Sequence, residues 1–242
     1  MRTTRSQQDK NQRALLQAAV DLMTQQGFEA TTMKQIARAA GLGDATVYKY
    51  FPSKEKLVLG YYERLLSDAL HDSLSTPGWD EFSLQERLQR LVDSVLDRLL
   101  PDREFVALTR GLIGQSPILL LGDQPPAKAL LTEAVRGWLD EAQARGEIPP
   151  SPIVGLLAGL VIDYLVGVVV YWLQDDSDEF NQTTQLVDLS LGLVVNTLQS
   201  GVLQRLLDLG GFVLRSQLAR LFSQGHGLLD LLKLARQASG AR

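Results

Sequence analysis

Apolar residues recur at helical spacing along most of the chain, and no long stretch alternates apolar and polar positions as a strand would. This pattern predicts an all-α protein. The expected helices cover residues 9–26, 32–40, 44–51, 53–74, 84–100, 103–115, 127–145, 153–173 and 183–203. Glycine and proline punctuate the pattern, as at Thr76-Pro77-Gly78. Apolar stretches at 203–222 and 228–236 predict two more helices, in an extension whose role the sequence leaves open.

Residues 32–51 have the pattern of two short helices joined by a glycine turn. Thr32, with Gln35 three residues later, predicts a capping box at the start of the first helix. Gly41 follows that helix where a left-handed residue is expected. In the second helix Gly43 supplies no side-chain cap, so Asp44 is expected to act as the N-cap. Two helices this short, the second with polar outer faces, predict a helix-turn-helix motif for the major groove of DNA.

The residues around this motif resemble the tetracycline-repressor (TetR) family of bacterial transcriptional regulators. The matching residues lie within about 10–60 and are Gly27-Phe28, Thr31-Thr32, Ile36-Ala37, Ala40-Gly41, Thr46-Val47-Tyr48, Tyr50-Phe51, Ser53-Lys54-Glu55 and Leu57. Two positions depart from the family, which usually has Ser or Thr in place of Gly43 and Gly or Pro in place of Ala45. The resemblance implies a DNA-binding domain, here 1–60, and a larger helical domain, 61–242, that binds a small molecule and dimerises.

The resemblance and the local chemistry indicate the same DNA-contacting side chains. They are Thr32, Lys34, Thr46, Tyr48, Lys49, Tyr50 and Lys54. We expect Thr46 and Lys49 to face the groove floor and Lys34 to reach a base edge or a phosphate. Tyr48, Tyr50 and Lys54 are expected to bond phosphates, and Thr32 to offer its backbone N–H to one. The alternative is that both tyrosines are ordinary core residues.

The distribution of charge changes the picture that the net charge of −4 suggests. Residues 1–60 carry a net charge of +4, whereas residues 61–242 carry −8. A basic head on an acidic body confines the attraction for phosphate to one end of the molecule. This asymmetry favours DNA binding by the head alone.

Residues 153–173 are long and apolar enough to cross a bilayer, with Asp163 as their one charge. A central Asp costs about 2.5–3.5 kcal/mol on insertion scales, and the flanks lack clusters of Lys and Arg. We therefore expect a helix buried in protein. The next apolar helix, 183–203, has the same need for burial, and pairing both with a second copy predicts a four-helix homodimer contact. The resemblance implies the same contact.

An effector pocket is expected inside the body, between the helices from 84 to 173. Its candidate lining residues are Phe105, Trp138, Asp163, Tyr164, Tyr171 and Trp172. Each aromatic can equally be ordinary core. Asp163 is the least ordinary, because a carboxylate among apolar neighbours needs a partner or a raised pKa. That partner is a cationic group of the ligand, or an Arg or Tyr across the dimer. The acidic run from Asp175 to Glu179 is expected to be a solvated loop.

Nothing in the sequence supports an enzyme. There is no cysteine, the two histidines are isolated, and neither a phosphate-binding glycine loop nor a Glu-x-x-His pair occurs. We therefore expect no cofactor and no metal. The N-terminus lacks the apolar run of a secretory signal, so a cytoplasmic location is expected. The prediction is a ligand-responsive repressor that is released from a palindromic operator, with a helical enzyme or an effector-free dimeric scaffold as alternatives.

Overall fold

The computed structural model describes residues 5–115, 126–202, 204–206, 208–209 and 212. Within these residues it contains helices and no strand, which confirms the all-α prediction. The helices are α1 (Arg5–Gln26), α2 (Met33–Ala39), α3 (Asp44–Tyr50), α4 (Lys54–Leu74), α5 (Leu84–Leu99), α6 (Arg103–Gln115), α8 (Pro126–Ala144), α9 (Val154–Trp172) and α10 (Asn181–Gln199). Three short 3₁₀ turns lie between them: η1 (Trp79–Glu81), η2 (Leu100–Asp102) and η3 (Asp178–Phe180).

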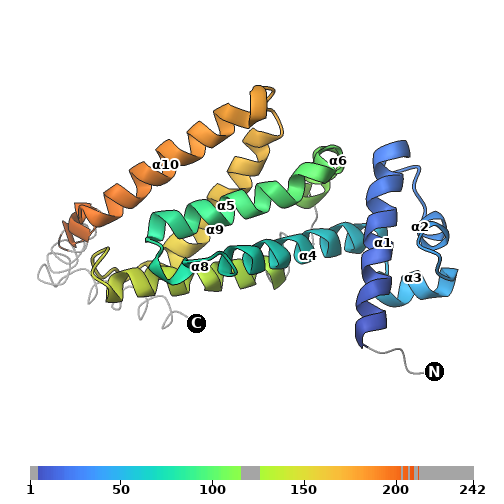
Figure 1. Cartoon of the computed structure of the whole chain (residues 1–242), viewed down its shortest axis with the longest axis horizontal. Coiled ribbons are helices and arrows are strands. Elements are labelled where there is room, and N and C mark those ends of the chain that lie inside the picture. The colour runs from blue at the N-terminus through green and yellow to red at the C-terminus, as the bar shows by residue number, and fades with distance from the viewer. Residues whose placement is uncertain (1–4, 116–125, 203, 207, 210–211, 213–242) are drawn as a thin grey trace, which may run out of the picture.

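Helices α1 to α3 form a small head at one end of an elongated molecule (Figure 1). Its core is apolar because each helix turns one face inward. Leu15, Ala19 and Met23 of α1 are fully buried, as are Ile36 of α2 and Val47 of α3. This packing gives short helices the tertiary support that their own length cannot supply.

Helix α4 belongs to both parts of the molecule, because it starts beside α1 in the head and runs along the body beside α5 and α8 (Figure 1). Its link to the head includes an ion pair between Arg64 and Asp9 of α1, with 2.7 Å between Nη1 and Oδ1. Its link to the body includes a two-pronged pair in which Arg98 of α5 bonds Asp72 at 2.6 and 2.9 Å. A displacement of α4 would therefore change contacts in both the head and the body.

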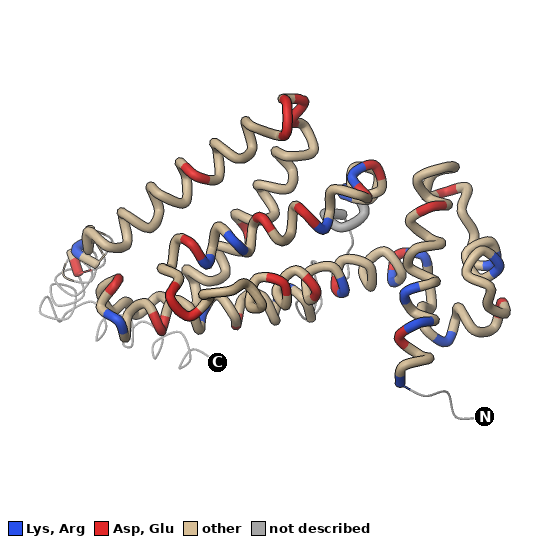
Figure 2. The backbone as a smooth tube through the Cα atoms, viewed as in Figure 1, with Lys and Arg blue, Asp and Glu red and all other residues tan. Residues whose placement is uncertain are grey.

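Helices α9 and α10 complete the body, with α9 packed against α8 and α10 against α5 (Figure 1). Each turns one apolar face inward, such as Ile162 and Leu165 of α9 and Val187 and Leu191 of α10. Both helices also expose apolar side chains, such as Leu160 of α9 and Leu193 of α10, and the backbone of α10 is nearly free of charged positions in Figure 2. One monomer therefore does not bury the whole of this helix pair.

Two local predictions need correction. Gly43, not Asp44, is the N-cap of α3; it makes no side-chain cap bond, and Asp44 is the first helical residue. A glycine can take the extended cap conformation at little cost, so the helix starts without the missing side chain. The helix expected over 183–203 spans Asn181–Gln199 and is followed by Gly201, whose positive φ of 67° interrupts it. The helices expected within 203–236 lie almost entirely outside the described residues.

Candidate DNA interface and the joint behind it

The turn between α2 and α3 has the geometry that the sequence predicts. The Thr32 hydroxyl accepts the Gln35 backbone N–H, and the Gln35 side chain accepts the Thr32 N–H at 2.8 Å, which closes the capping box. Gly41 is left-handed with a φ of 68°, and the Leu42 N–H donates to the Ala37 carbonyl at 2.9 Å. This bond spanning six residues is the Schellman ending of a helix. It turns the chain sharply into α3.

Helix α3 separates its apolar residues from its polar ones. Val47 is fully buried and Phe51, just after the helix, nearly so. On the outside, Tyr48 is 50% exposed and Lys49 is also exposed, while Thr46 is half-buried. Lys34 of α2 and Thr32, the N-cap of that helix, are also exposed. The structure thus brings a tyrosine, lysines and threonines to the outer surface of the helix-turn-helix, where no described side chain pairs with Lys34 or Lys49.

Two of the predicted DNA-contacting residues have partners inside the head. The Tyr50 hydroxyl accepts a bond of 3.2 Å from the side-chain amide of Asn11, and its ring packs against the core. The Lys54 ammonium donates to the backbone carbonyls of Phe28 and Glu29 at 2.6 and 3.3 Å, and lies 4.4 Å from the Phe28 ring centre. Tyr50 therefore holds α3 against α1, and Lys54 holds the start of α4 against the turn that follows α1.

The end of α3 fits into α4 at a glycine. A Cβ at Gly60 would lie 2.5 Å from the nearest carbon of the Phe51 ring. Only a residue without a side chain leaves room for this ring, because real Cβ contacts are not that short. The residue that follows α3 is therefore packed directly on α4.

The six candidate ligand residues do not gather around one described cleft. Phe105, Trp138 and Trp172 are buried among other rings; Trp138, for example, packs 5.2 Å from Trp79. The Tyr164 hydroxyl shares a bond of 2.7 Å with Ser190 of α10, and Tyr171 is 39% exposed. Their part in ligand binding stays a prediction.

The expected environment of Asp163 is wrong. Its side chain is 62% exposed and pairs with Lys128 of α8, with 2.8 Å between Oδ1 and Nζ. A carboxylate that remains in contact with water and a lysine needs no ligand to satisfy it. Helical spacing placed Asp163 in an apolar helix, but it did not show that α9 leaves this side of the helix uncovered.

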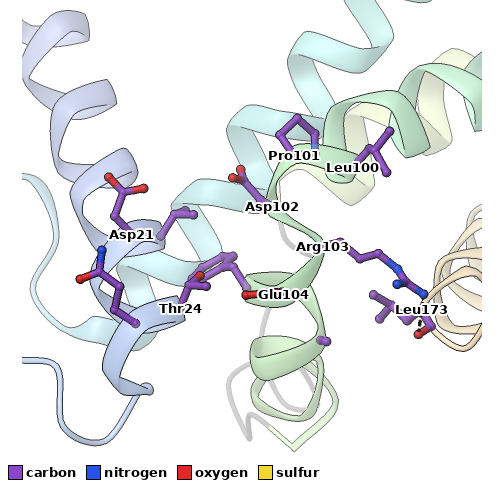
Figure 3. Close-up of a pocket in the computed structure, with 12 residues that line it drawn as sticks. Asp21, Thr24, Leu100, Pro101, Asp102, Arg103, Glu104 and Leu173 are labelled. Atoms are coloured by element: carbon purple, nitrogen blue, oxygen red, sulfur yellow. Dashed lines mark hydrogen bonds between the residues drawn. The ribbon is translucent and has the colours of Figure 1, made fainter.

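A cleft of about 550 Å³ lies at the joint between head and body. Its lining residues come from α1, from η2 and the start of α6, and from the end of α9; of the predicted ligand residues it includes Phe105 alone. Figure 3 shows Asp21 and Thr24 of α1 on one side, Asp102 and Glu104 near the middle, and the Arg103 side chain reaching away from α1 toward Leu173.

Contacts of η2 and α6 with α4 were missed by sequence reasoning. The Tyr61 hydroxyl of α4 donates to Asp102 at 2.9 Å, and the Tyr62 hydroxyl shares a bond of 2.8 Å with Thr109. Burial raises the pKa of Asp102, and the nearby Asp21 carboxylate raises it further, while the bond from Tyr61 opposes this. Burial also raises the pKa of Tyr62, to about 12. These groups form a polar seam between α4 and α6.

Asp175 is not part of a solvated loop, contrary to expectation. It is only 2% exposed, and its carboxylate accepts the backbone N–H and hydroxyl of both Ser177 and Thr183, at 2.6–2.9 Å. Burial alone would raise the pKa of Asp175, but these bonds outweigh it and hold the pKa well below its ordinary value. The short spacing to Ser177 was the one signal of such a turn in the sequence.

A basic head with a helix-turn-helix, joined by a shared helix to a larger helical body, defines a class of DNA-binding transcriptional regulators. The description "Bacterial regulatory proteins, tetR family" matches residues 15–61, and "Tetracyclin repressor-like, C-terminal domain" matches residues 87–213. The chain belongs to this family, and it is a ligand-responsive DNA-binding transcriptional regulator.

Relatives share the architecture over most of their length. The fatty acid metabolism regulator protein of Bacillus subtilis is 23% identical over 195 residues, which is 78% of this chain and 93% of that protein. A FadR structure from B. subtilis in complex with stearoyl-CoA has a TM-score of 0.58 at 21% identity, over 78% of this chain and 98% of that one. A tetR-family structure from Rhodococcus sp. has a TM-score of 0.62 at 18% identity, over 79% and 99%. At these identities the solved structures show the fold alone.

Proposed function

We propose that the protein is a homodimeric repressor that holds a palindromic operator and releases it when a small molecule binds. The observation that carries this proposal is the division of α3 into two faces. Val47 is buried in the core of the head, whereas Tyr48 and Lys49 form a polar outer surface. One seven-residue helix buries too little DNA for tight binding, so two heads must act together. Two copies related by a twofold axis require an operator with the same symmetry.

The dimer contact is proposed on the outer faces of α9 and α10. The exposed apolar residues there are Leu156, Leu160, Val166, Val170 and Tyr171 of α9, and Leu189, Leu193 and Val194 of α10. Soluble monomers rarely expose an apolar patch that continues across two helices. A second copy that presents the same pair would cover both faces in a four-helix contact.

The alternative is that a lipid bilayer, and not a second copy of the chain, surrounds the exposed face of α9. By length and composition this helix could cross a membrane, with a mean hydropathy of 2.2. The exposed Asp163 side chain opposes this, because a carboxylate at the middle of a bilayer is costly. The neighbouring α10 also exposes leucines although it carries polar residues along its length. We therefore propose that another protein chain, and not a bilayer, covers both helices. The proposed regulator is accordingly cytoplasmic.

Each head is proposed to read DNA through the surface of α2 and α3. Thr46 and Lys49 face the groove floor, Lys34 reaches a base edge or a phosphate, and Tyr48 bonds a phosphate. Thr32 binds a phosphate through its backbone N–H, and Tyr50 and Lys54 add phosphate contacts while holding the head together. The head's net charge of +4 attracts the duplex, and the body's charge of −8 keeps DNA away from other surfaces.

Gel retardation tests the DNA interface. Genomic fragments that the purified protein retains supply the operator, and Lys49→Ala is compared with Arg136→Ala, a change to an exposed arginine on α8. Loss of the Lys49 contact should cost about 1–3 kcal/mol, or roughly 5- to 150-fold in affinity, with unchanged helicity. The Arg136 variant should bind as wild type does. Equal affinities for all three proteins would contradict the proposed interface.

The effector is proposed to carry a long acyl chain. Support comes from the relatives, since one is a fatty acid metabolism regulator and another was solved with stearoyl-CoA. Stearoyl-CoA should raise the melting temperature and release the operator fragment, whereas coenzyme A alone should do neither. Chemical change of the ligand during incubation would support the enzyme alternative, and the absence of any shift would support an effector-free scaffold.

A further inference from the structure

Two consecutive residues where η2 passes into α6 contact opposite parts of the molecule. Asp102 accepts the bond from Tyr61 of α4, the helix on which the head is mounted. Arg103 reaches the other way, and its Nη2 atom lies 3.2, 3.1 and 3.0 Å from the backbone carbonyl oxygens of Trp172, Leu173 and Asp175. Figure 3 shows the two side chains diverging from the same turn.

On the head side, Asp102 contacts α4 next to the position where the Phe51 ring packs. Tyr61 follows Gly60, whose open backbone receives the Phe51 ring. Tyr61 is nearly buried, and its ring packs edge-on against Phe105 of α6, with 4.8 Å between centroids. A displacement of Asp102 would therefore act on α4 at the point where α3 is packed.

On the other side, Arg103 binds the corner between α9 and α10. The last carbonyls of a helix lack partners within it, and a cation there is favoured by the helix dipole. The guanidinium also lies 5.5 and 5.2 Å from the rings of Trp172 and Phe180. Asp175, whose carbonyl Arg103 contacts, accepts the Thr183 N–H near the start of α10. One guanidinium thus gathers the end of α9 and the start of α10.

We propose that Asp102 and Arg103 form a coupling pair that fixes the position of the head relative to the α9–α10 corner, with Arg103 as its positioning residue. Consecutive Cα atoms are about 3.8 Å apart across a rigid peptide, so the two contacts cannot move independently by much. Pro101, within η2, further restricts the backbone at this point. The inference rests on the proposed function, in which α9 and α10 hold the dimer and the heads must keep a fixed spacing.

The test measures the distance between head and body within one protomer. The chain has no cysteine, so Ala39→Cys in the head and Ala144→Cys at the end of α8, both exposed, place two spin labels at chosen positions. Labelled chains are mixed with excess unlabelled wild type, so that pulsed electron resonance reports distances within a chain. The coupling is removed from either side by Arg103→Gln or Tyr61→Phe, and Arg136→Gln on α8 is the matched control.

Loss of either contact should broaden or shift the distance distribution, while Arg136→Gln should leave it as in wild type. Operator affinity should fall in the same two variants, by about 5- to 150-fold for a coupling of ordinary size. If Arg103→Gln does not fold, Arg103→Lys keeps a charged nitrogen but loses the planar guanidinium beside the Trp172 and Phe180 rings, and should broaden the distribution as well. Unchanged distributions, even with a lower melting temperature, would show that these contacts only stabilise the fold and would overturn the proposal.

The same data separate this proposal from the proposed function. A wild-type chain that is monomeric or does not retain DNA would refute the repressor. The intrachain distances would still decide whether Arg103 and Asp102 position the head.

Discussion

The dimer contact can be tested by placing a charge in the middle of the exposed α10 face. Leu193 is 69% exposed in the monomer, and full burial of a leucine side chain is worth about 1.5–3 kcal/mol. Burying the exposed two-thirds of it would therefore contribute roughly 1–2 kcal/mol, and twofold symmetry doubles this to roughly 2–4 kcal/mol per dimer. Leu193→Asp removes that gain and adds the cost of desolvating two carboxylates, several kcal/mol more.

A total loss above about 4 kcal/mol corresponds to a dimer dissociation constant at least about a thousandfold higher. Sedimentation velocity over a dilution series would measure it directly. The matched control is Leu130→Asp on α8, where the leucine is 44% exposed but lies outside the proposed contact. A Leu193→Asp protein that dimerises as tightly as wild type would show that α10 does not carry the interface.

Two further predictions concern contacts described above. Gly60→Ala should destabilise the protein by about 1–3 kcal/mol, because the new methyl overlaps the Phe51 ring. Gly137→Ala, whose new methyl would have no atom within 4 Å, should stabilise α8 by up to about 1 kcal/mol. Thermal unfolding would compare the two variants, and equal effects would refute the close contact between Gly60 and Phe51. Asp175 has a lowered pKa in the folded state, so its stabilising contribution is complete well above its ordinary pKa of 3.8 and is lost as pH falls through and below that value. The melting temperatures of wild type and Asp175→Asn should therefore converge on acidification, and a constant difference from pH 7 to pH 3 would argue against it.

The head was predictable from sequence because its signals are local. The capping box of Thr32 and Gln35 and the left-handed Gly41 depend on residues a few positions apart, and both appear as expected. The N-cap of α3 was assigned to Asp44 because a side-chain cap is the common case. Glycine can also hold that position, and sequence alone did not reveal this choice.

The joint behind the head was not predictable, because its contacts join residues far apart in the chain. Arg103 donates to the carbonyl of Leu173, which lies about 70 residues later in the chain. Helical periodicity does not predict a contact between residues so far apart. Asp175 looked like one member of an acidic loop, yet its hydrogen bonds and burial come from the way η3 folds back toward α10. Burial of a single charged residue depends on tertiary packing, which helical spacing does not encode.

The contact between the Phe51 ring and Gly60 limits where the head of this chain can be joined to the body of another protein. A graft that ended at Phe51 would place the ring against whatever residue the recipient carries at the position of Gly60, and any side chain there would collide with it. A graft that extended past Tyr61 would instead bring a hydroxyl whose acceptor, Asp102, stays behind. A junction directly after Gly60 keeps the Phe51 contact within the donor segment and leaves Tyr61 out of it, at the cost of the ion pair between Asp9 and Arg64.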